Sequence, residues 1–241
     1  MRWLIAQRWE ELLFAHWHVD PRGVRPLLPP GVELDLRDGA AWVGIVAFVM
    51  RGTRLAAGPA RPALPPIPEL NLRTYVRVGG VPAVWFLSLD TDSRTFVTLG
   101  RALFGLRYRR ARMAVVADGD AVRFVSSAGP FAFASAYRPA GPPVPASGGS
   151  LEHFLTERYR LFSLRRGRLV TADVAHEPWP LQPAEAEIGL NRLAPRGVVL
   201  EGEPLLHFSR SVSARISPPT LVRASSEPAA LRALRSAGAR R

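Results

Sequence analysis

Short alternating segments separated by tight-turn signals occupy most of this 241-residue chain, and they constrain its fold more than any other feature. Strands place successive side chains on opposite faces, and Asp-Gly or Gly-Gly pairs readily adopt the positive φ angles of two-residue hairpin turns. Such segments flank Asp38-Gly39, Gly79-Gly80 and Asp118-Gly119. The sequence therefore predicts three β-hairpins, with further strands within 166–177 and 205–216.

Helical signals are confined to two stretches of the chain. The first begins at Asp92 or Ser93, ends at Gly105, and places four apolar residues on one face: Phe96, Leu99, Leu103 and Phe104. The second begins near Ser150, and its inward residues are Leu151, Phe154, Leu155 and Tyr159. Because strands outnumber helices, we predict an α+β, mainly β fold with a large antiparallel sheet and two or three covering helices.

Length and composition favour one domain, because 241 residues of which 47% are apolar can bury a substantial core. We assign residues 1–222 to this domain and predict that the arginine-rich segment 223–241 is a disordered tail. No apolar run is long enough to span a bilayer, and charged residues interrupt the only N-terminal apolar stretch. Since cysteine is also absent, we expect a cytoplasmic protein.

The basic residues are all arginine, since the chain contains neither lysine nor cysteine. A Schiff base requires a side-chain amine and thiol chemistry requires a thiol, so both mechanisms are excluded. Glycine-rich phosphate loops and Gly-x-Ser-x-Gly elbows are absent as well, and no cofactor is implied. A net charge of +12 suggests nucleic acid as a partner, but stacking motifs and zinc spacings are missing. We therefore expect neither a nucleic-acid nor a membrane partner; the sequence does not determine the oligomeric state.

The segment ELNLRTYV carries the most informative local pattern. Alternation places Glu69, Asn71, Arg73 and Tyr75 on one face of a strand and apolar residues on the other. A polar strand face is commonly solvated. In a closed or cone-shaped sheet, however, the same face lines a ligand cavity, where arginine binds an anion and glutamate transfers a proton. Both interpretations are open at this point.

Histidines and tryptophans supply the other candidates. His16, His18 and Asp20 alternate along an extended segment, but no third ligand set with a familiar metal spacing follows, so we predict no metal site. A hydrogen-bonded role is the expectation, and His16 remains a ligand-binding candidate. His176 and Trp179 can form a pocket wall, for which packing in the core is the alternative.

Six segments in order resemble the YqjF-like family, domain of unknown function 2071: LLFAHWHVDP, PELNLRTYV, WFLSLD, GRALFGLRYRRARM, SLEHFLTERY and HEPWPLQPAEAEI. The resemblance extends over residues 3–216 and departs from the usual pattern at His18, Gly100 and Arg107. That family is similar in fold to acetoacetate decarboxylase. The resemblance implies a cone-like or barrel-like β architecture with a pocket for a small organic acid.

The signature segment of acetoacetate decarboxylase has a Gly-Arg pair, a later glycine and a Pro-Lys pair. In this chain the corresponding positions are Gly100-Arg101, Gly105 and Arg107-Tyr108. Tyr108 replaces the Schiff-base lysine, so the resemblance implies the pocket but not the decarboxylase mechanism. A looser alignment places Glu69 where that family keeps an acidic residue near its amine.

Tyr108 and Glu69 are the predicted catalytic residues. If a strand begins at Tyr108, Arg110 lies on the same side, and nearby positive charge favours a phenolate that acts as general acid or base. The substrate is then a carboxylate held by Arg73. An aromatic residue after a helix-ending glycine is also a common core residue.

Three functions are compatible with these patterns. The first is an enzyme acting on a small organic acid without a Schiff base, whose ligand-binding residues are Asn71, Arg73, Tyr75, His16, Arg110 and Trp179. The second is a non-catalytic carrier or sensor of a hydrophobic metabolite, bound by Trp42, Trp85 and Trp179. The third is an arginine-driven protein acting on nucleic acid or acidic membranes through segment 223–241.

Overall fold

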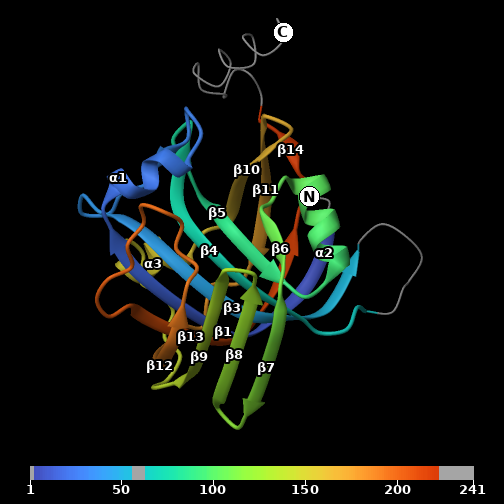
Figure 1. Ribbon diagram of the computed structural model, residues 1–241, viewed down its shortest axis with the longest axis vertical. Helices are drawn as coiled ribbons and strands as arrows, with labels where there is room; N and C mark the ends of the chain where they lie inside the picture. Colours follow the sequence, from blue (N-terminus) through green and yellow to red (C-terminus); the bar gives the residue numbers. More distant parts are fainter. Residues whose placement is uncertain (1–2, 56–62, 223–241) are drawn as a thin grey trace, which may run out of the picture.

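A computed structural model of the chain describes residues 3–55 and 63–222, so the tail predicted at 223–241 lies outside the described residues. Strands dominate, which confirms the mainly β class (Figure 1). The strands are β1 (Ile5–Val19), β2 (Glu33–Leu34), β3 (Ala41–Leu55), β4 (Ile67–Val78), β5 (Val81–Thr91), β6 (Tyr108–Arg110), β7 (Arg112–Asp118), β8 (Ala121–Ala128), β9 (Phe131–Pro139), β10 (Arg160–Arg165), β11 (Arg168–His176), β12 (Gln182–Asn191), β13 (Leu205–Ile216) and β14 (Thr220–Leu221).

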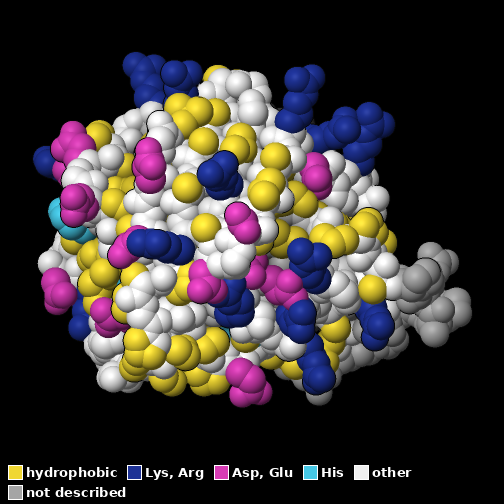
Figure 2. Space-filling model, turned by 90° about the horizontal axis from the view of Figure 1, so that it is seen from below, with side chains coloured by type: hydrophobic (Ala, Val, Ile, Leu, Met, Phe, Trp, Pro, Cys, Tyr) yellow, Lys and Arg dark blue, Asp and Glu magenta, His cyan; other side chains and the backbone are white. Residues whose placement is uncertain are grey.

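The helices are short: α1 (Pro21–Val24), the 3-10 helix η1 (Arg25–Leu27), α2 (Arg94–Leu99), the π-helix η2 (Gly100–Phe104) and α3 (Leu151–Thr156). None of the helices in the described ranges is long and apolar enough to cross a membrane. Figure 2 shows one face of the molecule, on which arginine and acidic side chains are interspersed among apolar ones.

The strands belong to one sheet with the order β14-β11-β10-β5-β4-β3-β1-β13-β12-β9-β8-β7. Most neighbours are antiparallel, but β5 pairs in parallel with β10 and with β6. The prediction of an antiparallel sheet is therefore wrong for these two pairs of strands. Parallel neighbours need a long connection, and the segments that follow β5 in the chain provide it. In addition, β11 pairs with β13, so the ladder that starts at β11 and passes through β10, β5, β4, β3, β1 and β13 returns to β11.

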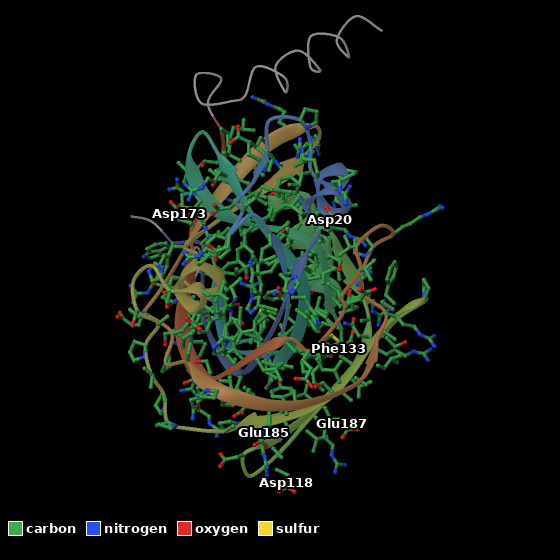
Figure 3. All side chains as sticks on the ribbon, turned by 90° about the vertical axis from the view of Figure 1, so that its left-hand side faces the viewer. Asp20, Asp118, Phe133, Asp173, Glu185 and Glu187 are labelled. Carbon is green, nitrogen blue, oxygen red and sulfur yellow. The ribbon has the colours of Figure 1, made fainter. Side chains whose placement is uncertain are left out.

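The central strands β1, β3 and β4 are buried on both faces. One face forms the main core with β8 and β9, and this core includes Leu13, Ile45, Leu72 and Phe133. In Figure 3, Phe133 points into the body, whereas Glu185 and Glu187 of β12 lie at its exposed rim. The other face of the central strands packs against the aromatic residues around Trp179 and against α3. Polar residues on that second face are therefore enclosed.

The first predicted hairpin is only partly present. Asp38 and Gly39 have the expected positive φ angles of 53° and 78°, and a single bridge joins Arg37 to Ala40 across them. The preceding strand β2 pairs with β4 instead of β3. The reason is that both edges of β3 are already occupied, one by β1 and the other by β4. The hairpins β4–β5 and β7–β8 are confirmed.

The helix predicted before Gly105 is present but changes type along its length. The Ser93 side chain accepts a hydrogen bond from the backbone N–H of Phe96, and Gly105 ends the helix with a φ of 67°. Between them the π-helix η2 widens the turn, so the predicted apolar face is not kept. Phe104 is buried, but Leu99 and Leu103 are each 39% exposed.

The second helix begins as predicted, since Ser150 caps α3 by accepting from the backbone N–H of His153. It ends at Thr156, earlier than expected. Tyr159 was expected on the inward face, but it lies beyond the helix and is 40% exposed. Leu155 is completely buried, so one turn of α3 covers the second face of the central strands.

Candidate functional site

Strand β4 places Glu69, Asn71, Arg73 and Tyr75 on one face, as alternation predicts. Glu69, Asn71 and Tyr75 are buried and Arg73 is half-buried, which excludes the interpretation of a solvated face. Asn71 Nδ2 donates to Glu69 Oε1 at 3.3 Å, and Arg73 Nε donates to Asn71 Oδ1 at 3.0 Å. We call these four residues, together with Tyr108 and His16, the β4 polar face.

Tyr108 reaches this face from a different part of the chain. Gly105 ends the π-helix, β6 then pairs in parallel with β5, and Tyr108 Oη donates to Glu69 Oε2 at 2.6 Å. The Tyr108 ring lies directly on Gly100, where an added Cβ would be 2.5 Å from ring carbons Cδ2 and Cε2. The missing side chain at Gly100 therefore leaves the space in which the tyrosine meets the glutamate.

The Glu69–Tyr108 pair holds its proton on the phenol. Burial and the neighbouring Glu69 carboxylate raise the pKa of Tyr108 well above its usual value. The predicted phenolate is therefore wrong, because Arg110 is exposed and the group that contacts the phenol is an anion. Burial also raises the pKa of Glu69, against the opposing effects of hydrogen bonds from Tyr108 and Asn71. A carboxyl group that protonates readily and a phenol that donates to it suit proton transfer.

The raised pKa of Glu69 predicts a pH dependence of stability. The folded protein holds the Glu69 proton to a higher pH than the unfolded chain does. The stabilisation of the fold by this proton is therefore fully present below the pKa of Glu69 in the unfolded chain, and it is lost as the pH rises through the pKa of Glu69 in the folded protein. Glu69→Gln does not titrate, so the variant should gain free energy of unfolding relative to the wild type as the pH rises above the ordinary pKa of glutamate, about 4.3. Urea unfolding at a series of pH values measures the difference, and a slope of the opposite sign would contradict it.

His16 and Tyr75 form a second buried pair beside Arg73. His16 Nε2 lies 2.8 Å from Tyr75 Oη, which also donates to the backbone oxygen of Leu155 at 2.7 Å. Burial lowers the pKa of His16 well below its usual value, with Arg73 adding to the effect, while burial raises the pKa of Tyr75 to about 12. Both side chains are therefore neutral at physiological pH.

The other two residues of the His-x-His segment do not join His16. His18 is exposed and packs edge-on against Trp42, with 6.0 Å between the centres of the two rings. Asp20 accepts from the backbone N–H of Arg22 at 2.8 Å and caps α1. The three side chains thus have separate hydrogen-bonding or packing partners.

An aromatic wall adjoins the β4 polar face. Trp179 is buried, and its Nε1 donates to the backbone oxygen of Thr156 at 2.9 Å. The centre of its ring lies 4.6 Å from the ring centre of His176, 5.0 Å from that of Phe14 and 5.9 Å from that of Trp9. His176 and Trp179 therefore pack against each other, and whether they form the wall of a ligand pocket stays a prediction. Trp85, in contrast, belongs to the main core on the opposite face of the sheet, so it cannot share a ligand with Trp179 there.

A cavity of about 400 Å³ opens beside α3. It is lined by the proline-rich segment 142–150 and by residues of β12 and β13, including His207. In the sheet register His207 is opposite Phe14, two residues from His16 on the same face of β1. The sequence did not indicate this neighbour, because the pairing of β13 with β1 joins residues that are far apart in the chain.

Arg73 is the unusual charge of the site. Its Nε bonds to Asn71, its guanidinium lies 5.9 Å from the centre of the Phe86 ring, and within the described residues it forms no ion pair. Burial lowers the pKa of Arg73, but a guanidinium remains protonated under all ordinary conditions. The β4 polar face therefore presents a half-buried cation whose two Nη atoms make no hydrogen bond to the described part of the chain.

Comparison with known proteins agrees with the resemblance found in the sequence. The DUF2071 family model, described as an uncharacterized conserved protein, matches residues 6–213. The chain belongs to the DUF2071 family. Within this family, the uncharacterized protein YqjF of Bacillus subtilis (strain 168) is 42% identical over 213 residues, which cover 86% of this chain and 88% of that protein.

Solved structures extend the similarity to the acetoacetate decarboxylase fold. An acetoacetate decarboxylase from Legionella pneumophila has a TM-score of 0.65 at 14% identity, covering 90% of this chain and 87% of that one. The enduracididine biosynthesis enzyme MppR complexed with pyruvate has a TM-score of 0.64 at 15% identity, covering 94% and 93%. An acetoacetate decarboxylase-like enzyme from Sphingomonas wittichii RW1 has a TM-score of 0.63 at 16% identity, covering 92% and 94%. This DUF2071 member therefore shares their fold.

Proposed function

We propose that this protein binds a small organic acid at the β4 polar face and transfers a proton to or from it. The observation that carries the proposal is the half-buried guanidinium of Arg73, which has no carboxylate partner in the described chain. Arginine presents paired N–H groups that match the two oxygens of a carboxylate. A ligand carboxylate would supply the missing counter-ion.

The surroundings of Arg73 support a ligand of limited size. The ladder that returns to β11 suggests a cone-like enclosure around the second face of the central strands, and α3 packs over it. Among proteins of similar fold, two act on or bind small carboxylic acids by name, namely acetoacetate decarboxylase and MppR complexed with pyruvate. Small carboxylates are accordingly the first ligands to test.

The catalytic groups of the proposal are Glu69 and Tyr108. Since the chain has no lysine, a Schiff base between a side-chain amine and a carbonyl ligand cannot form. Glu69 has a raised pKa and accepts the Tyr108 hydrogen bond, so it can exchange a proton with the ligand while the phenol stabilises the carboxylate. The reaction class is thus general acid–base catalysis on a bound acid.

Arg73→Ala should weaken the binding of pyruvate about 100-fold, because a charge-assisted contact in a half-buried site is lost. Isothermal titration calorimetry measures the affinity, and circular dichroism checks the fold. Arg112→Ala, which removes an exposed arginine, is the matched control and should leave the affinity unchanged.

A different outcome would favour the carrier function, for which the aromatic wall of Trp9, Phe14 and Trp179 is the supporting observation. If Arg73→Ala and the wild type bind pyruvate equally, Arg73 is not the anchor and the proposal fails. Binding of an apolar ligand without a carboxylate, equally strong in both proteins, would then point to a carrier or sensor of a hydrophobic metabolite.

A further inference from the structure

A second cavity, of about 300 Å³, lies where the π-helix η2 meets the hairpin of β10 and β11. Three arginines line it, Arg101, Arg165 and Arg166, together with apolar residues that include Leu106 and Leu164. None of its lining residues belongs to the β4 polar face, and every charged residue among them is an arginine. The cavity is therefore positively charged and separate from the site around Arg73.

Backbone oxygens hold two of these guanidinium groups in place. Arg101 Nε donates to the backbone oxygen of Tyr108 at 2.8 Å, and Arg101 Nη2 donates to the same oxygen. Arg165 Nη1 donates to the backbone oxygen of Leu103 at 2.9 Å. Nη1 of Arg101 and both Nε and Nη2 of Arg165 make no hydrogen bond to the described residues. Because a guanidinium group carries five N–H donors, both groups are oriented and still have donors for a ligand.

The positive charge around this cavity is not compensated by acidic side chains of residues 3–55 and 63–222. Arg168, a fourth arginine nearby, is the register partner of Arg165 across the β10–β11 hairpin. Like charges directly opposite each other on neighbouring strands repel and destabilise the pairing. None of the four arginines forms an ion pair within the ranges just given. An anion bound among them would remove this repulsion.

Arg166 occupies a turn position that disfavours a long side chain. It is the first central residue of the two-residue turn between Arg165 and Arg168 and has a φ of 50°, and Gly167 follows with a φ of 71°. Positive φ angles at both central positions define the type I′ hairpin turn, which prefers asparagine, aspartate and glycine. Backbone strain of this kind concentrates at functional sites. The strained arginine therefore indicates a use for its charge at this place.

We propose that this cavity binds a small ligand that carries a diphosphate group. Arginine N–H groups match phosphate oxygens in pairs, and three cations without an acid suit a multiply charged group better than a single carboxylate. The arginines belong to two elements, since Arg101 lies on η2 and Arg166 lies in the turn after β10. Each element can thus contact one phosphate group. The site goes beyond the proposed function, and neither proposal depends on the other.

Calorimetric titration of the full chain with inorganic pyrophosphate and with inorganic phosphate, at equal ionic strength, tests the site. Pyrophosphate should bind about tenfold more tightly than phosphate, because it contacts both elements at once. Arg165→Gln and Arg166→Gly should each weaken the binding of pyrophosphate about tenfold, since each loses a charge-assisted hydrogen bond. Glycine suits a positive φ, so the midpoint of urea unfolding of Arg166→Gly should be no lower than that of the wild type. This measurement separates lost binding from lost folding.

Arg123→Gln is the matched control, because it removes an exposed arginine of β8 that does not line the cavity. Its affinity for pyrophosphate should equal that of the wild type. Equal weakening in all three variants would mean that net charge alone attracts the anion, and equal affinity in all three would mean that the anion binds elsewhere. Either result, or no binding of pyrophosphate, overturns the site.

A double-stranded DNA oligonucleotide distinguishes a small ligand from a nucleic acid as the source of the phosphate groups. It should bind the wild type and Arg166→Gly with the same affinity, because a cavity of about 300 Å³ is at the lower limit even for small molecules. If DNA binding is lost in Arg166→Gly while pyrophosphate does not bind the wild type, the proposed ligand class is wrong. All of these outcomes are independent of the binding of pyruvate at Arg73.

Discussion

Gly105→Ala should lower the free energy of unfolding by more than about 3 kcal/mol, a large effect for one methyl group. The residue has a φ of 67°, a conformation that itself costs an alanine about 1 kcal/mol. An added Cβ would also lie 2.2 Å from the backbone oxygen of Leu164 and 2.9 Å from Arg165 Cα. Because these are backbone atoms of β10, no change of rotamer can relieve the collision.

Gly189→Ala is the control for this substitution, since nothing lies within 4 Å of the position where its Cβ would be. The free energy of unfolding of this variant should differ from that of the wild type by less than about 0.5 kcal/mol. Urea unfolding of both variants measures the contrast. Equal stabilities would show that the turn after the π-helix η2 can move away from β10, and Tyr108 would then not be held rigidly against Glu69.

Arg158→Met should destabilise the fold by about 3 kcal/mol, because it breaks a buried ion pair. Arg158 Nη1 lies 2.7 Å from Asp35 Oδ2, and the two side chains are 6% and 5% exposed. Its Nε also donates to the backbone oxygen of Phe154 in α3 at 2.7 Å, and its guanidinium lies 5.2 Å from the Tyr75 ring centre. Arg77 still pairs with Asp35, which keeps the expected cost at the lower end for buried pairs.

The matched control is Arg138→Met, which breaks an ion pair with Glu185 whose side chains are 63% and 62% exposed. Its effect on the free energy of unfolding should be below about 1 kcal/mol, because solvent screens an exposed pair. Hydrogen exchange should also show faster opening of α3 in Arg158→Met alone. If the two variants are equally stable, the Asp35 contact does not hold α3 over the β4 polar face.

Local signals in the sequence were sufficient for much of the fold. Alternation along β4 placed Glu69, Asn71 and Arg73 on one face, and this face is the centre of the candidate site. The helix boundaries at Ser93 and Gly105 followed from side-chain capping and from the positive φ of glycine. Each of these features depends on residues within a few positions of each other.

Other features depend on residues that are distant in the chain, and the sequence predicted them less well. The predicted pairing of β2 with β3 was wrong, because both edges of β3 already pair with other strands, and this depends on the whole sheet. The prediction of a phenolate at Tyr108 was wrong. Arg110 is close in sequence but exposed, whereas the carboxylate that contacts the phenol is Glu69. The neutral His16 bonds to Tyr75, whose hydroxyl also donates to the backbone oxygen of Leu155, 80 residues beyond Tyr75.

The sequence by itself determined which chemistry is available and which side chains lie on the same face of a strand. The absence of lysine excludes a lysine Schiff base in any fold, and the two-residue period of a strand is a property of the backbone. Only the tertiary structure decided protonation and charge compensation at the site. These depend on burial and on partners from separate strands, so Tyr108 is a phenol, His16 is neutral, and Arg73 is a cation that forms no ion pair within the described chain.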